Sequence, residues 1–154
     1  MRHTLTIALL SLVTPVLAQT PPPPAASAHL EHVALDVADL AKSVAFYQSL
    51  FGLREIPATV TGPRWLDLGH GIQLHLIPGR TVAVPDNRKT HLALAVPDVD
   101  ALMVELRRRK IPFTDFFGAS DKYTVTRSDG AKQIFVADPD GYWIEVNDQV
   151  GAPR

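Results

Sequence analysis

The chain contains an internal repeat, and this repeat constrains the fold more than any other feature. The segment HVALDVAD, which begins at His32, returns as HLALAVPD at His91, an offset of 91 − 32 = 59 residues. Each copy is an apolar strand pattern that ends in an aspartate, Asp39 or Asp98, and aspartate is a preferred helix N-cap. The pattern therefore predicts helices over 40–50 and 99–109, with Gly52 ending the first and Pro112 lying just beyond the second.

A second correspondence closes each half of the repeat. The segment at 71–77 resembles 141–147 at an offset of 145 − 75 = 70, so the second half carries about 70 − 59 = 11 extra residues. We place these in the polar segment 118–130. Each half then predicts the order βαβββ, and the fold class is α+β, with two βαβββ modules forming a curved mixed-sheet cup. The expected modules are 29–78 and 90–148, with strands near 30–37, 53–60, 64–68, 72–77, 90–96, 113–117, 132–137 and 142–147.

The segments outside these modules predict processing and a tether. Residues 1–18 combine a basic start with an apolar stretch that ends at Ala18, the pattern of a secretory signal peptide, although an uncleaved anchor has a similar pattern. Four consecutive prolines favour an extended tether over 19–28, and 149–154 is a short tail. We therefore expect a periplasmic or secreted protein with no stable membrane insertion after processing.

Charge and cysteine content narrow the function classes. The formal net charge is −1, and removal of residues 1–18, which contain Arg2 and no acid, gives −1 − 1 = −2. This balance does not favour nucleic acid as a partner. The basic run at 107–110 fits the C-terminus of the second helix. Because the chain has no cysteine, disulfides, thiolate ligands and cysteine nucleophiles are excluded.

Strand alternation brings out four candidate metal ligands. In four of the expected strands one face is aliphatic, and the opposite face carries a single histidine or glutamate. These residues are His32, His75, His91 and Glu145. Any one of them alone would more often be a structural polar residue, but four at matching positions of a repeat predict a shared role. Three imidazoles and a carboxylate would suit one divalent ion of Zn, Ni, Mn, Fe or Co.

At these residues the sequence resembles the vicinal-oxygen-chelate superfamily, which includes glyoxalases, bleomycin resistance proteins, extradiol dioxygenases and fosfomycin resistance proteins. The resemblance covers about 30–148, and its most specific string is DPDGYWIE over 138–145. It implies metal ligands on the first strand of each module, His32 and His91, and on the last strand, His75 and Glu145. It also implies a homodimer, with the cup built either within one chain or from halves of two chains.

The match to any one activity of this superfamily is weaker. Both last-strand ligands of glyoxalase I are typically glutamate, and His75 replaces the first of them here. Extradiol dioxygenases use two histidines and one carboxylate, which His32, His91 and Glu145 would supply, with His75 as an additional ligand. Three functions stay open: a glyoxalase-like lyase or isomerase acting on a substrate with vicinal oxygens, an extradiol-type dioxygenase, and a non-catalytic binding or resistance protein.

The remaining expectations concern residues that act on the substrate. Glu145 and His75 are the candidate catalytic residues, because a detached carboxylate or a neutral imidazole accepts a proton. The candidate substrate contacts share the cup face or lie near it; they are Trp143, Gln73, Asn147, Trp65, Phe135, Tyr123 and Arg127. The segment 118–130 is either a lid over the cup or a long hairpin loop.

Overall fold

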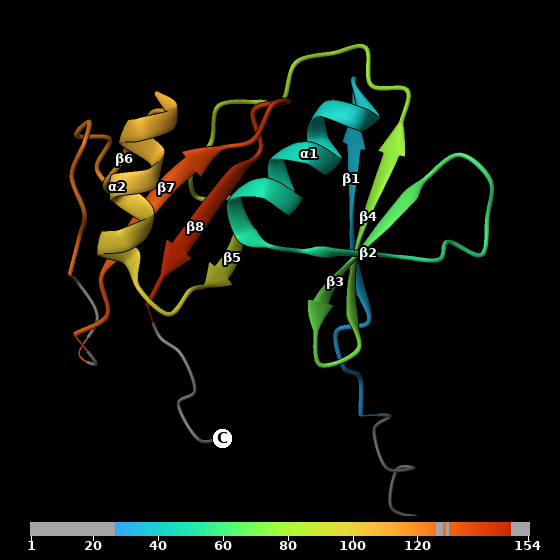
Figure 1. The fold of residues 1–154 in the computed structure, drawn as a ribbon, viewed down its shortest axis with the longest axis horizontal. Coiled ribbons are helices and arrows are strands. Elements are labelled where there is room, and N and C mark those ends of the chain that lie inside the picture. The colour runs from blue at the N-terminus through green and yellow to red at the C-terminus, as the bar shows by residue number, and fades with distance from the viewer. Residues whose placement is uncertain (1–26, 126–127, 129, 149–154) are drawn as a thin grey trace, which may run out of the picture.

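A computed structural model describes residues 27–125, 128 and 130–148 (Figure 1). The expected signal peptide, most of the tether, Arg127 and the C-terminal tail lie outside the described residues. The element order is β1 (His32–Val37), α1 (Leu40–Phe51), β2 (Arg54–Ile56), β3 (Arg64–Gly69), β4 (Ile72–Pro78), β5 (Leu92–Ala95), α2 (Val99–Arg109), β6 (Phe113–Thr114), β7 (Gln133–Ala137) and β8 (Trp143–Asn147). Neither helix in this part of the chain is long and apolar enough to cross a membrane.

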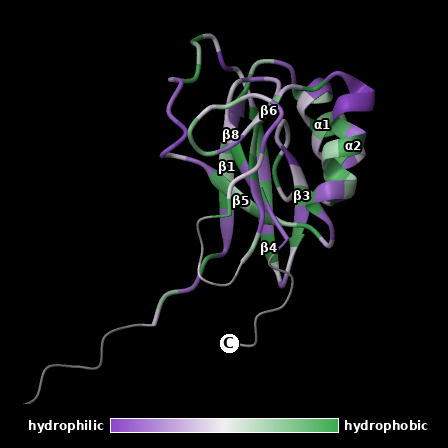
Figure 2. Cartoon of the chain, turned by 90° about the vertical axis from the view of Figure 1, so that its left-hand side faces the viewer, coloured by the Kyte–Doolittle hydropathy of each residue, from purple (hydrophilic) through white to green (hydrophobic). Residues whose placement is uncertain are grey.

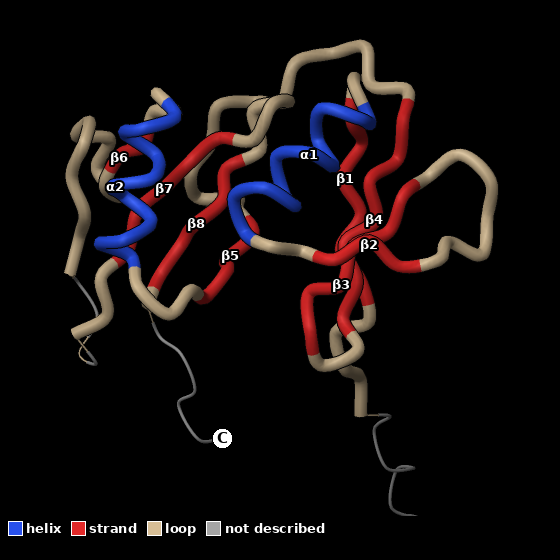
Figure 3. Tube along the Cα trace, in the orientation of Figure 1, coloured by secondary structure: helices blue, strands red, loops and turns tan. Residues whose placement is uncertain are grey.

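The strands form two four-stranded mixed sheets with the same topology (Figure 3). The orders are β1-β4-β3-β2 and β5-β8-β7-β6, and in each sheet the first and last strands of the module pair in parallel. The register repeats too, because Ala34 lies opposite His75 in the first sheet and Ala93 lies opposite Glu145 in the second. The predicted pair of βαβββ modules is therefore confirmed.

Both helices begin at the aspartates that the repeat predicted. The Asp39 carboxylate accepts a hydrogen bond from the Lys42 amide at 3.0 Å, and Asp98 accepts one from the Ala101 amide at 2.9 Å. Gly52 ends α1 in the left-handed region with a φ of 67°. Both helices lie on the same side of the two sheets, as Figure 2 shows, so the other face of each sheet is left for a site.

The apolar faces of both modules merge into a single core. It contains Leu35, Val37, Val44, Tyr47, Leu66, Leu74 and Leu76 from the first module and Val99, Leu102, Met103, Leu106, Phe113, Ile134, Val136, Ile144 and Val146 from the second. The inward residues alternate along β1, β4 and β8 as the sequence predicted. Residues of the other phase, among them His32, His75 and Glu145, are consequently directed to the opposite face.

Three strands are at least three residues shorter than the sequence predicted. The strand β5 spans Leu92–Ala95 instead of 90–96, so His91 lies just before it. The strand β2 ends at Ile56 instead of continuing to Val60, because Pro57 has no amide hydrogen for the ladder. The strand β6 ends at Thr114, because the next residue starts a turn in which Asp115 binds the amides of Gly118 and Ala119. The described part of 118–130 then returns to the sheet, with bridges from Ser120 to β6 and from Thr124 to β7.

The two modules are joined by acidic side chains of the turn 138–141. The carboxylate of Asp138, which is only 5% exposed, accepts a hydrogen bond from the Tyr47 hydroxyl at 2.9 Å. Asp140 reaches the N-terminal end of the same helix, where it accepts hydrogen bonds from the Ser43 hydroxyl at 3.0 Å and the Ala38 amide at 2.8 Å. These contacts join sequence positions about a hundred residues apart, so they fix how the second module sits on α1.

Burial sets the protonation behaviour of this contact. Desolvation raises the pKa of Asp138 from its ordinary value of 3.8, although the amides of Tyr142 and Asp140 and the Tyr47 hydroxyl act in the opposite direction. The pKa of Tyr47 is raised well above its ordinary value, first by burial and then by the neighbouring Asp138. A carboxyl group whose pKa is higher in the folded state stabilises the fold at low pH, and this contribution is lost as the pH rises through that pKa.

We therefore expect Asp138→Asn to become relatively more stable as the pH rises. Urea unfolding from about pH 4 to 7 will show the wild-type free energy of unfolding falling relative to that of Asp138→Asn, because asparagine carries no titrating charge. Tyr47→Phe, which removes the hydroxyl donor from the buried carboxylate, will lower the free energy of unfolding at pH 7 by about 1–3 kcal/mol. A stability difference between wild type and Asp138→Asn that does not change with pH would contradict this account.

Candidate functional site: two half-sites on the open faces of the sheets

The first half-site is a stack of three aromatic rings from three strands of the first sheet. The His75 imidazole of β4 lies between the Trp65 indole of β3, at a centroid distance of 4.1 Å, and the His32 imidazole of β1, at 4.2 Å. The rings are nearly parallel, with interplanar angles of 5° and 9°. Trp65 faces His75 directly across the antiparallel pair, so strand register alone forms half of the stack. The structure thus brings His32 and His75 together.

Polar neighbours orient the imidazoles of this stack. The Gln73 side-chain oxygen lies 2.8 Å from His75 Nε2 and accepts its proton when that nitrogen is protonated. Glu31 pairs with Nδ1 of His32. Desolvation, and then the nearby His32, lower the pKa of His75 below its ordinary value of 6.5, while Glu31 acts in the opposite direction. The stack therefore favours a neutral His75, which is the form that binds a metal ion or accepts a proton.

The second half-site is a histidine–carboxylate pair on the second sheet. His91, just before β5, places Nε2 at 3.2 Å from Oε2 of Glu145 on β8. The other carboxylate oxygen of Glu145 accepts a hydrogen bond from the Asn147 side-chain amide at 3.0 Å. The backbone carbonyl of Arg88 lies 2.6 Å from His91 Nδ1. Because a carbonyl can only accept, His91 Nδ1 carries the proton.

This arrangement leaves two electron-pair donors facing each other. With the proton on Nδ1, a neutral His91 presents the lone pair of Nε2 towards the carboxylate oxygen of Glu145. Two such acceptors at 3.2 Å repel unless a proton or a metal ion lies between them or beside them. The geometry of the second half-site therefore suits a cation.

Aromatic rings form the wall beside the second half-site. Phe135 of β7 is fully buried and meets the His91 ring edge-on at a centroid distance of 5.2 Å. Phe116, from the loop after β6, covers Phe135 at 5.8 Å. Phe135 is therefore packed as a wall of the site and does not present an open surface. This placement explains why both faces of β7 are buried.

The linker between the modules, residues 79–89, covers the indole of Trp143 on the second sheet. The indole nitrogen of Trp143 donates a hydrogen bond to Asp86 at 2.8 Å, and the Arg88 guanidinium lies 4.7 Å from the centroid of the indole. Sequence reasoning selected Trp143 but missed both linker residues. The available signal was the string DNRK at 86–89, a cluster of charges placed immediately before a candidate ligand.

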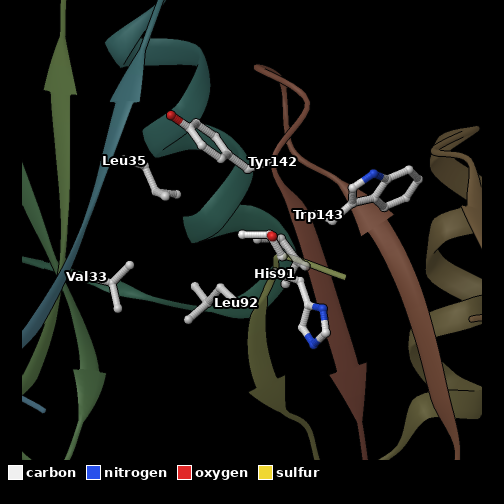
Figure 4. A pocket seen from close by; sticks show the side chains of 8 residues that line it. Val33, Leu35, His91, Leu92, Tyr142 and Trp143 are labelled. Atoms are coloured by element: carbon white, nitrogen blue, oxygen red, sulfur yellow. The ribbon is translucent and has the colours of Figure 1, made fainter. Parts of the chain in front are cut away.

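An apolar cavity of about 260 Å³ lies between the two modules, near the second half-site. Figure 4 shows Val33 and Leu35 of the first module facing Leu92 and Tyr142 of the second across this cavity. His91 also lines it, while the Trp143 indole points away from Val33 and Leu35. The cavity could therefore hold an apolar part of a ligand, and it adjoins the second half-site.

The structure brings the four candidate ligands together in two pairs. Within 27–125, 128 and 130–148, no group of three or more histidine, aspartate or glutamate residues lies close enough to hold one metal ion. His32 and His75 form one pair, and His91 and Glu145 form the other. A shared site for all four stays a prediction. Tyr123 is exposed and its ring lies beneath the Lys132 ammonium, and Arg127 lies outside the described residues.

The ring stack predicts a pH-dependent fluorescence signal. The chain has two tryptophans, so Trp143→Phe leaves Trp65 as the only one. We expect its emission to fall as the pH is lowered, because protonated His75 quenches a stacked indole, with a midpoint below 6.5 since burial lowers the pKa of His75. The step should be absent when His75→Asn is added to Trp143→Phe. A midpoint at or above 6.5, or a step that persists in the double variant, would refute the assignment.

Comparisons with known proteins agree with this topology. Solved structures with a similar fold include the oxidase ChaP-H2, with a TM-score of 0.67 at 20% identity over 80% of this chain and 94% of that one. A glyoxalase/dioxygenase from Nostoc punctiforme has a TM-score of 0.63 at 26% identity over 88% and 97%. The fosfomycin resistance protein FosX from Mesorhizobium loti has a TM-score of 0.57 at 18% identity over 77% and 90%. No protein of curated function matches the sequence significantly.

A family model also matches most of the chain. Residues 29–146 match the Glyoxalase/Bleomycin resistance protein/Dioxygenase superfamily, and this range contains both half-sites and nearly all of both modules. The repeated βαβββ topology, the ligand-type residues on the first and last strands, and this match lead to the same conclusion. The chain belongs to the glyoxalase, bleomycin resistance protein and dioxygenase superfamily, which is the vicinal-oxygen-chelate superfamily that its motifs resemble.

Proposed function

We propose that the protein is an exported, metal-dependent enzyme of the glyoxalase-like lyase or isomerase type. Its substrate is a small molecule that offers two neighbouring oxygen atoms. The observation that carries the proposal is the His91–Glu145 pair, in which an imidazole nitrogen and a carboxylate oxygen face each other at 3.2 Å. His32 and His75 occupy the corresponding strands of the other module, so the chain has two halves of one ligand set.

The four candidate ligands have side chains that suit a divalent ion, but a single chain holds them in two separate pairs. Imidazole and carboxylate are ligands for Zn²⁺, Ni²⁺, Mn²⁺, Fe²⁺ or Co²⁺. Because two protein ligands rarely suffice for a catalytic metal site, each pair needs the other. We infer that the complete site forms in a homodimer, where His32 and His75 of one chain meet His91 and Glu145 of its partner.

A metal ion held there would act as a Lewis acid on two adjacent substrate oxygens. The residues of the chain supply the rest of the chemistry. Glu145 is the candidate proton acceptor, and its hydrogen bond from Asn147 keeps the carboxylate oriented. His75, whose pKa is lowered by burial, is the second candidate because a neutral imidazole is available at pH 7. The backbone carbonyl of Arg88 holds His91 in one tautomer.

Two other functions compete with this one. Three histidines and one glutamate on tetrahedral zinc would make a closed site with no position for substrate, which favours a binding or resistance protein. A ferrous ion bound by His32, His91 and Glu145 favours an oxygenase, and the relative from Nostoc punctiforme is named a glyoxalase/dioxygenase. Oxygen uptake with catechols would identify the oxygenase, and four-coordinate zinc in X-ray absorption would identify the closed site.

Metal content provides the first test of the proposal. We expect about one tightly bound divalent ion per chain in the full-length protein, none in His91→Ala, and roughly 10- to 100-fold weaker binding in Asn147→Ala, which loses the hydrogen bond that orients Glu145. His70→Ala is the matched control, because His70 lies in the turn between β3 and β4 and is not a candidate ligand. Elemental analysis and competition with a chelator measure the effect, and equal metal content in His91→Ala and wild type would reject the site.

Mixed dimers provide the second test, because they distinguish a site within one chain from a site between chains. One variant carries His32→Ala with His75→Ala, and the other carries His91→Ala with Glu145→Ala. Neither binds metal alone, but after unfolding and refolding together they regain about a quarter of the wild-type sites if each site uses two chains, since half of the dimers are mixed and each has one intact site. A mixture that binds no metal, from variants that refold and dimerise, would refute the shared site.

A further inference from the structure

The linker places the side chain of Arg88 against Trp143 of the second sheet, and the neighbouring loop leaves space for it. The Arg88 guanidinium lies 4.7 Å from the centroid of the Trp143 indole, a cation–π arrangement. Its Nε is buried, with no hydrogen-bond partner in the described part of the chain. Residue 118 is glycine, and a Cβ atom there would lie 2.8 Å from Arg88 Nη1. The loop after β6 thus leaves space for this guanidinium.

The positive charge of Arg88 has no paired acid among the residues that the structure describes. Arg88 and Lys89 line a cavity of about 260 Å³ with Asp86, Asn87 and Phe116. Asp86 is the acid nearest in sequence, and one of its oxygens is engaged by the Trp143 indole nitrogen. Within the described residues, no ion pair involves Arg88 or Lys89. Two cations and one acid therefore meet at a cavity of the size of a small ligand group.

This cavity adjoins the second half-site. The backbone carbonyl of Arg88 contacts His91 at 2.6 Å. Trp143, on which the Arg88 guanidinium stacks, lies two residues before Glu145 on the same strand. Residues two apart on a strand share a face. A group bound by Arg88 would therefore belong to a molecule whose other end can reach the His91–Glu145 pair.

We propose that Arg88, assisted by Lys89, is a binding subsite for an anionic group, a carboxylate or a phosphate. A guanidinium presents two parallel N–H donors that match either group. Stacking on Trp143 fixes the plane of the guanidinium in advance, which reduces the entropy lost on binding. That this anion is part of the substrate rests on the proposed function, whereas the subsite itself does not.

The test uses full-length protein that has been stripped of metal and dialysed free of chelator, so that anions cannot bind through a metal ion. Inorganic phosphate and acetate are titrated separately while the arginine Nε–Hε signals are followed by NMR. The buried Nε of Arg88 should give an observable signal, which Arg88→Lys identifies by its absence. We expect a saturable shift of this signal, and binding roughly 10- to 100-fold weaker in Arg88→Gln as measured by intrinsic tryptophan fluorescence.

Arg54→Gln is the charge-matched control. Arg54 lies on β2 of the first module and pairs with Asp67 on the neighbouring strand, so its loss should leave anion binding unchanged. A response to phosphate alone identifies a phosphate subsite, and a response to both probes identifies one that also takes carboxylates. No saturable shift of the Arg88 signal in wild type, or equal binding in wild type and Arg88→Gln, would overturn the proposal.

The same preparations separate this proposal from the proposed function. Phosphate or acetate binding in a chain that never takes up a divalent ion would leave the subsite standing and reject the metal-dependent enzyme. Uptake of a divalent ion without any anion response would reject the subsite and leave the enzyme standing. Lys89→Gln should weaken binding less than Arg88→Gln, because its ammonium cannot form the paired contact.

Discussion

The parallel pairing of the first and last strand in each module is the constraint on which the site depends. It sets the register that places Ala34 beside His75 and Ala93 beside Glu145. Because side chains alternate across a strand, a one-residue shift of the strand register would point the candidate ligands into the core. The same shift would expose the leucine and valine side chains that now form the core. The aliphatic residues beneath the helices therefore hold the ligands on the open face, so the hydrophobic core and the chemistry of the site are set by the same register.

Much of the fold could be read from the sequence because local rules govern it. Helix α1 begins after Asp39 and α2 spans the predicted 99–109, since capping and apolar periodicity are local properties. The four candidate ligands could be selected from alternation and repetition. Whether the two pairs meet depends on how the modules are placed, and no residue pattern within one module encodes this.

The contacts between modules were the part that sequence reasoning did not reach. In the sequence, Asp138 and Asp140 stood out only as part of the string DPDGYWIE, yet their carboxylates bind Tyr47, Ser43 and the amide of Ala38. A tyrosine on the buried face of a helix was the available signal, because its hydroxyl needs a partner. Arg88 was missed for a related reason: its position over Trp143 depends on a linker whose path has no periodic pattern.

The linker has a consequence for how such proteins diversify. It joins two modules with the same topology, and it also provides the carbonyl that orients His91 and the guanidinium that covers Trp143. Exchange or lengthening of these few loop residues would alter which molecules are admitted without disturbing either sheet or either core. A duplicated scaffold of this kind can therefore acquire new selectivity in a segment that duplication did not copy.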